Sequence, residues 1–297
     1  MYAAYAGEFQ VAEDESRAVH EPETYVTLAL AFAQSGRELL DAARATYRKL
    51  AAIDMLGASF AASGLADLDL YEGHFSESVR ILEDGIRSDL AAKNATRAAR
   101  KYVAIAEAHL SRGRLNDAVS VAERALQTSK ALPIRFLAAR ILANAKASIK
   151  AESLATELVS DCAAEPRALG RIVIANVALN KGEPQKAIDI LLEANSILDT
   201  WLGHFDLGRA YLASSAAAQA DSECDRCLKR RGEALSVLLD EEPTYGYLPM
   251  AYYYQGRVRQ QLNPGGFAES YRRYIEIRGG SSEDPLLSEV RALAANR

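Results

Sequence analysis

The apolar positions of the chain follow a helical period along most of its length, and short polar stretches interrupt them. In residues 105–126, "IAEAHLSRGRLNDAVSVAERAL", apolar residues recur three or four positions apart on both sides of Gly113. That period places them on one face of an α-helix. The stretch therefore predicts one helix, a glycine turn and a second helix.

Small residues occupy fixed places in this unit. Ala106, Ala118 and Ala125 are separated by twelve and then seven residues. The same spacing recurs in five further copies: Ala66, Ser78, Gly85; Ala139, Ala151, Leu158; Ala175, Ala187, Ala194; Gly208, Ala220, Cys227; and Gly256, Ala268, Ile275. An earlier copy, Ala29, Ala43 and Leu50, has two more residues in its turn. Because packed helices lie ~8 to 10 Å apart, small residues belong where they cross. The pattern predicts stacked helix pairs.

The repeat resembles the tetratricopeptide repeat (TPR) family. The lines that carry the resemblance are "GLADLDLYEGHFSESVRILEDGI", "YVAIAEAHLSRGRLNDAVSVAERAL", "IVIANVALNKGEPQKAIDILLEA" and "LGRAYLASSAAAQADSECDRCL". The fragment "LGRAYL", residues 207–212, matches the leucine, glycine and tyrosine of the family's first helix. The chain departs from the family in lacking the usual first-helix tryptophan in register and most of the closing prolines.

The resemblance implies an all-α fold, a right-handed α-solenoid of TPR-like antiparallel helix pairs. We expect about seven repeats and an N-terminal half repeat in a single array. The expected boundaries are a partial repeat at 1–22, repeats at 23–53, 54–92, 93–131, 132–164, 165–199, 200–242 and 243–281, and a C-terminal capping helix at 282–297.

Three irregularities break the array. The half repeat at 1–22 leaves an apolar face without its neighbour, so we expect an upstream domain of a longer protein or a homo-oligomer contact there; a short natural cap is the alternative. Residues 217–241 are expected to form one long second helix, as a brace or a binding surface. Five tyrosines, Tyr245, Tyr247, Tyr252, Tyr253 and Tyr254, serve an interface or fill the space beside that helix.

Composition narrows the partners. The net charge of −5 and pI near 5.6 argue against nucleic acid as a partner. No uninterrupted apolar stretch approaches the ~18 residues of a membrane span, and the N-terminus lacks the pattern of a secretory signal. Three cysteines fit a reducing compartment, so a cytoplasmic location is expected.

The sequence offers no recognisable catalytic or metal-binding motif, which favours a protein that is not an enzyme and has no cofactor or metal. Cys224 and Cys227 form a C-x-x-C pair, but they lie three residues apart on a helix, in packing positions, without the further ligands of a zinc site. The histidines, His20, His74, His109 and His204, are scattered. Phosphate-binding, dinucleotide-binding and nucleophile-elbow motifs are absent from the sequence.

The TPR resemblance implies a concave groove lined by first helices that holds a peptide. By first-helix position, its residues are Asp67, Tyr71, Glu107, Phe136, Arg140, Asn144, Ile172, Asn176, Asn180, Phe205, Arg209, Tyr253, Arg257 and Gln261. The groove changes from acidic in early repeats to Arg- and Asn-rich in later ones, so we expect an acidic peptide or protein segment as partner. Ile172 and Asp206 stand where the chaperone-type carboxylate clamp resembles lysine and asparagine, so that clamp is not expected.

Residues 227–257, "CLKRRGEALSVLLDEEPTYGYLPMAYYYQGR", are similar to repeat regions attached to bacterial serine/threonine kinases and other signalling proteins. This similarity implies a non-catalytic protein-protein interaction scaffold, the regulatory or docking part of a larger bacterial signalling protein. The alternative is a ligand- or peptide-sensing arm of a transcriptional regulator.

Overall fold

The computed structural model describes residues 1–19, 21, 23–262 and 267–295. These residues form α-helices and short 3-10 turns, and none of them lies in a β-strand. The helices are α1 (Tyr2–Tyr5), α2 (Phe9–Ala18), α3 (Thr24–Gly36), α4 (Leu40–Leu50), α5 (Met55–Glu72), α6 (Phe75–Ala91), α7 (Ala95–Ser111), α8 (Leu115–Thr128), α9 (Leu132–Asn144), α10 (Ser148–Val159), α11 (Ala164–Asn180), α12 (Pro184–Ile197), α13 (Trp201–Ala213), α14 (Ala217–Lys229), α15 (Leu248–Leu262), α16 (Ala268–Arg278) and α17 (Leu287–Ala295). Two 3-10 turns, η1 (Glu233–Leu235) and η2 (Tyr245–Tyr247), lie between α14 and α15.

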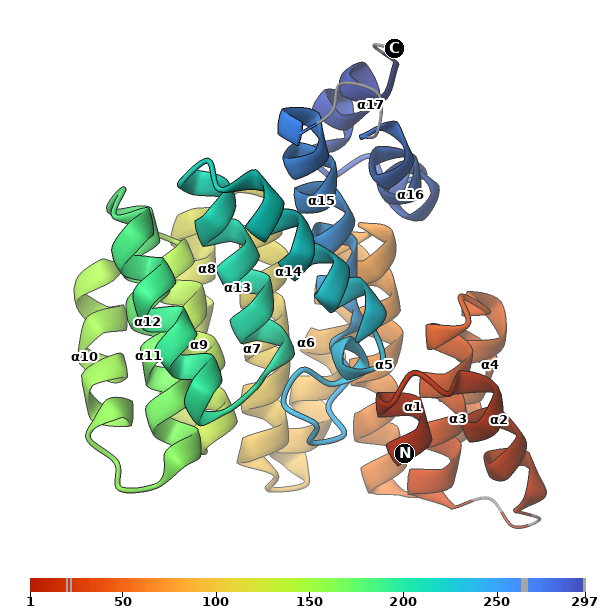
Figure 1. Ribbon diagram of the computed structural model, residues 1–297. Helices are drawn as coiled ribbons and strands as arrows, with labels where there is room; N and C mark the ends of the chain where they lie inside the picture. Colours follow the sequence, from red (N-terminus) through yellow and green to blue (C-terminus); the bar gives the residue numbers. More distant parts are fainter. Residues whose placement is uncertain (20, 22, 263–266, 296–297) are drawn as a thin grey trace.

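The helices pack in consecutive pairs, α3 with α4 through to α15 with α16, and stack as an all-α solenoid (Figure 1). This confirms the predicted fold class. The small residues lie where the pairs cross, and Ala66, Ala106, Ala139 and Ala175 are all fully buried. First helices of successive pairs also contact each other, as α7 does with α9, so they form the inner layer of the array.

In the six pairs from α3–α4 to α13–α14, the turn between the two helices has one residue in the left-handed conformation. A left-handed residue ends a helix by satisfying its last carbonyl groups, and glycine adopts it without steric cost. Three turns use glycine and three use other residues: Gly73, Gly113, Gly182, Glu38, Lys146 and Ser215. The recurrence of this device explains why the pairs fold as similar hairpins although only half of the turns carry glycine.

The predicted long helix at 217–241 is wrong. α14 ends at Lys229, and after η1 the chain is irregular until η2. A Cβ added at Gly232 would lie 2.4 Å from the carbonyl oxygen of Ala4, so the backbone approaches α1 too closely for any other residue. Ala234, Leu235 and Val237 are buried in the core on the inner side of the array instead of following a helix face. We call residues 233–247 the concave segment.

The array curves until its last pair meets its early ones. Arg278 of α16 is 3% exposed and donates hydrogen bonds to the carbonyl oxygens of Leu70 and Tyr71 at the end of α5. The Ser281 hydroxyl donates to the carbonyl oxygen of Gly73 at 2.7 Å. α16 therefore lies near α5, and the concave segment lies beside α5, below α15 in the view of Figure 1.

The face of the N-terminal half repeat, expected to lack a neighbour, is partly covered by the same chain. The Arg231 guanidinium lies 5.4 Å from the centre of the Phe9 ring. The backbone N–H of Glu241 donates to the hydroxyl of Tyr5. The curvature of the array brings the end of α14 back to α1, which sequence spacing does not reveal. Tyr2 and Val11 stay exposed.

The tyrosines near the C-terminus fill space. Tyr245, Tyr252 and Tyr253 are at most 9% exposed, so the filling alternative holds, although they pack beside the concave segment and not beside a long helix.

Among the described helices, none combines the length and apolarity that a bilayer crossing requires.

Candidate functional site on the concave face

Four of the expected groove residues meet around a carboxylate that was not among them. Asp206 of α13 accepts two hydrogen bonds from Arg140 of α9, both at 2.9 Å, and one at 2.7 Å from Asn176 of α11. Arg209 donates to Asp206 at 2.8 Å and to the side chains of Asn176 and Asn144. Three neighbouring first helices are thereby joined by one polar network.

This network is buried, and its one carboxylate lies between two guanidinium groups. Asp206 and Arg140 are 1% and 3% exposed. Burial by itself would raise the pKa of Asp206, but the charges of Arg140 and Arg209 outweigh it and hold the pKa at about 2. The Arg140 guanidinium is therefore committed to Asp206. It is not free to receive a ligand carboxylate, contrary to the expectation from the sequence. Arg209 keeps a side-chain exposure of 15%.

The acidic residues of the early repeats hold the concave segment. Asp67 of α5 accepts the backbone N–H groups of Tyr245 and Gly246, at 2.7 and 2.9 Å. The Tyr245 ring stacks on Tyr71 with centroids 5.1 Å apart. The Tyr247 hydroxyl donates to Glu107 of α7 at 3.1 Å. Expected groove residues thus do contact a peptide chain, but it is the protein's own.

Burial raises the pKa of both of these carboxyl groups. It raises the pKa of Asp67 to about 7, because desolvation outweighs the hydrogen bonds from Gly246 and Tyr245. Burial also raises the pKa of Glu107, against the lowering effect of Arg140. Both carboxylates lie against the concave segment.

The acidic residues of the concave segment have basic and polar partners. Arg100 of α7 forms an ion pair with Asp240 at 2.7 Å and lies 4.0 Å from Glu242. The Ser63 hydroxyl of α5 donates to Glu242 at 2.6 Å. Arg278 reaches the carbonyl oxygen of Gly246 at 3.5 Å. Side chains of α5, α7 and α16 therefore bind the backbone, the acidic side chains and the aromatic side chains of the concave segment.

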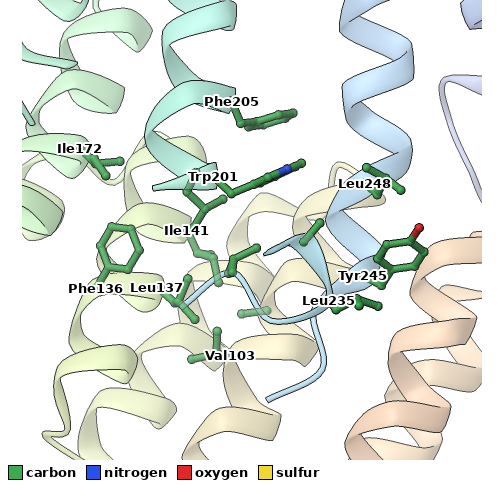
Figure 2. Close-up of a cluster of buried hydrophobic side chains, with 14 of the residues drawn as sticks. Val103, Phe136, Leu137, Ile141, Ile172, Trp201, Phe205, Leu235, Tyr245 and Leu248 are labelled. Carbon is green, nitrogen blue, oxygen red and sulfur yellow. The ribbon is translucent and has the colours of Figure 1, made fainter. Parts of the chain in front are cut away.

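A narrow cavity of about 60 Å³ remains between the segment and the first helices. Its walls are mainly apolar and include Val103, Ile134, Leu137, Val237 and Leu238. Figure 2 shows Val103 and Leu137 on one side and Leu235, Tyr245 and Leu248 on the other. At about 10 to 15 Å³ per water it holds a handful of water molecules. With the segment in place, the cavity is too small for a drug-sized ligand.

The other expected groove residues do not join these two clusters. Phe136 and Ile172 are fully buried between helices, and Phe205 stacks on Trp201 at 5.3 Å (Figure 2). Tyr253 is buried, and its hydroxyl accepts a hydrogen bond from Arg257. The exposed members of the set are Asn180, Arg257 and Gln261.

The buried members face their neighbours because a residue one turn from the crossing lies on the face that packs against the next helix. Sequence spacing alone missed Asp206 as the centre of the network, Arg100, and the concave segment. The signal for Asp206 was a carboxylate three residues before Arg209 on a helix that is otherwise mainly apolar.

The two cysteines of α14 are buried, and His204 is hydrogen-bonded. The Cys224 and Cys227 thiols are buried, as their packing positions predict, and burial raises the pKa of Cys224 to about 12. His204 bonds to Glu223 and Asp199 at 2.6 and 2.9 Å. His20 lies outside the described residues.

Within the described chain, one group of side chains has metal-ligand spacing: Asp69, Glu72 and His74. The guanidinium of Arg44 forms ion pairs with both of these carboxylates. Its charge therefore takes the place that a cation would need.

The architecture places the chain in a known class of fold, that of the tetratricopeptide-repeat proteins. A crystal structure of a tetratricopeptide repeat protein from Parabacteroides merdae matches 97% of this chain and 99% of its own, with a TM-score of 0.51 and 13% sequence identity. A Rap protein complexed with Competence and Sporulation Factor matches 100% of this chain and 96% of its own, with a TM-score of 0.50 and 13% identity. No protein-family model matches the sequence, and no curated protein is similar to it in sequence.

Proposed function

We propose that the chain is a non-catalytic protein-interaction scaffold that binds an extended peptide segment of a partner on its concave face. One observation carries the proposal: this face already holds the fifteen residues of the concave segment, which form no α-helix, through contacts suited to peptides. Asp67 binds successive backbone N–H groups, and Tyr71 stacks on an aromatic side chain. Backbone hydrogen bonds with pockets for alternate side chains are how proteins bind extended peptides.

The comparison supports the same conclusion. The Rap protein whose fold resembles this chain was solved in complex with Competence and Sporulation Factor. The resemblance of residues 227–257 to signalling proteins supports a regulatory or docking role within a larger bacterial signalling protein. We propose a cytoplasmic setting for that role.

A peptide-display selection tests the proposal. Peptides selected from a random library on the intact protein should crosslink to a photoreactive residue placed at Asn180, which is exposed and bonds to the inner helix α9. They should not crosslink to the same residue placed at Ile149, which is 85% exposed on α10. Equal crosslinking at the two positions, or a selection that enriches no peptide, would refute the proposed function.

A further inference from the structure

The concave segment is held in a conformation that it would not adopt alone. Leu239 and Glu241 have φ values of 53° and 64°, in the left-handed region. A leucine there is an outlier, and such residues persist only when surrounding contacts impose them. Leu239 is 51% exposed, so its own side chain contributes little to holding this turn. Release of the segment would therefore relieve strain.

Hydrogen bonds within the segment, such as those between Ser236 and Asp240, hold part of this conformation, and groups on other elements hold the rest. Arg100 pairs with Asp240, Ser63 donates to Glu242, and Asp67 receives the backbone at Tyr245 and Gly246. These receiving groups belong to α5 and α7, which would keep their own helical packing if the segment left. The receiving groups are therefore separable from residues 240–247, while Ala234, Leu235 and Val237 of the segment stay in the core.

The charge pattern of the occupant defines what the receiving surface recognises. Its residues 240–247, "DEEPTYGY", present three acidic residues before a proline and a tyrosine. Arg100 has a side-chain exposure of only 17%, so leaving it without a carboxylate would bury an unpaired charge. Glu107 likewise needs a donor such as the Tyr247 hydroxyl. A ligand that replaces the segment must bring both carboxylates and a tyrosine.

We infer that the concave segment is an internal pseudo-ligand, and that the partner is an extended acidic, tyrosine-containing peptide of another protein that displaces it from α5 and α7. This inference rests on the proposed function and specifies its ligand. Because the segment is tethered, it competes at an effective concentration of about the millimolar range. The apparent affinity for a partner is reduced by the fraction of molecules in which the site is open. Weakening the segment should therefore strengthen binding in trans.

The test uses the intact chain and a labelled synthetic peptide of residues 236–247, "SVLLDEEPTYGY". An opened variant, Asp240→Ala with Glu242→Ala, loses the acidic anchors of the segment and keeps the receiving groups. We expect it to bind the peptide at least about tenfold more tightly than the wild-type chain does. The gain should vanish when Arg100→Ala is added. It should also vanish when the acidic residues of the peptide are replaced by Asn and Gln.

A second measurement needs no variant. In hydrogen exchange on the wild-type chain, a large excess of peptide should deprotect the backbone amides of Tyr245 and Gly246, which bond to Asp67. The peptide with Asn and Gln should not. Circular dichroism of the opened variant verifies that its helices remain folded.

Equal peptide affinity of the wild-type chain and the folded opened variant would overturn the inference, as would equal binding of the two peptides. Dimerisation of the opened variant without peptide binding would also overturn it, because the surface would then take a second copy of the chain. If library peptides crosslink at Asn180 but share no acidic or tyrosine pattern, the proposed function stands and this inference fails.

Discussion

Breaking the buried pair of Arg140 and Asp206 should destabilise the array far more than breaking an ion pair on its surface. The pair joins α9 to α13 across the inner layer, with two hydrogen bonds of 2.9 Å and side-chain exposures of 4% and 1%. The perturbation is Arg140→Met, which keeps most of the volume and removes the charge. It leaves Asp206 with Arg209 and Asn176 as its hydrogen-bond partners.

The magnitude follows from burial. Removing one partner of a buried pair costs about 3 to 5 kcal/mol when the other charge is left alone. Because Arg209 and Asn176 still contact Asp206, we expect the lower end of that range, about 3 kcal/mol. At ~2 to 4 °C per kcal/mol for a chain of this size class, the melting temperature should fall by on the order of 10 °C. The matched control is Arg171→Met, whose partner Glu193 is 56% exposed. Exposed pairs contribute about 0 to 1 kcal/mol, so the control should change little.

The assay is urea unfolding followed by tryptophan fluorescence. Trp201 is the only tryptophan and stacks on Phe205, the residue before Asp206, so its emission reports on this region. A double-mutant cycle with Asp206→Leu measures the coupling between the two charges. The double variant should lose less stability than the sum of the two single losses, because each single change already breaks the Arg140–Asp206 pair.

Two results would refute this reasoning. One is a loss below about 1 kcal/mol for Arg140→Met, equal to that of the surface control. The other is a double variant whose loss equals the sum of the single losses, since coupled neighbours should deviate from additivity by at least about 0.5 kcal/mol.

Three further predictions concern other parts of the chain. Because the pKa of Asp206 is lowered to about 2, its contribution to stability is present above about pH 4 and is lost as the pH falls toward 2. The midpoint of urea unfolding should therefore fall less over that pH range in Asp206→Leu than in the wild type. Gly64→Ala places a Cβ 2.1 Å from an aromatic ring of α4 and should cost about 1 to 3 kcal/mol, whereas Gly208→Ala, with 3.4 Å to its nearest atom, should melt at or slightly above the wild-type temperature. With a thiol reagent the folded protein should react at the exposed Cys162 alone, and reaction of the two buried α14 cysteines before unfolding would contradict their packing role.

Local pattern was sufficient for the helices and their pairing. Ala106 and Ala118 lie at a crossing that their spacing predicts, and both are fully buried. Hydrophobic period, turn glycines and small crossing residues act within about forty residues of chain, so each repeat specifies its own hairpin. The pair of cysteines in α14 was correctly interpreted for the same reason, because the register of the repeat places both at packing positions.

The hydrophobic pattern did not predict the conformation of residues 230–247, because that conformation depends on contacts with residues far away in the sequence. The helical period continues through Leu235 and Leu238, yet Gly232 lies against α1, and Asp67 captures the backbone N–H of Tyr245 from 178 positions away. The same limit applies to the groove. Spacing placed Arg140 on the inner layer but did not reveal that Asp206, 66 residues later, neutralises it.

The amino-acid sequence by itself determined the solenoid: helices, hairpin turns and small residues at the crossings, all of which are satisfied by neighbours along the chain. Only the tertiary structure decided what fills the concave face. The accumulated curvature of the array brings η1 back to α1 and α16 back to α5. Small rotations between repeats add up over many helices. No local pattern determines which distant helices the total rotation brings into contact.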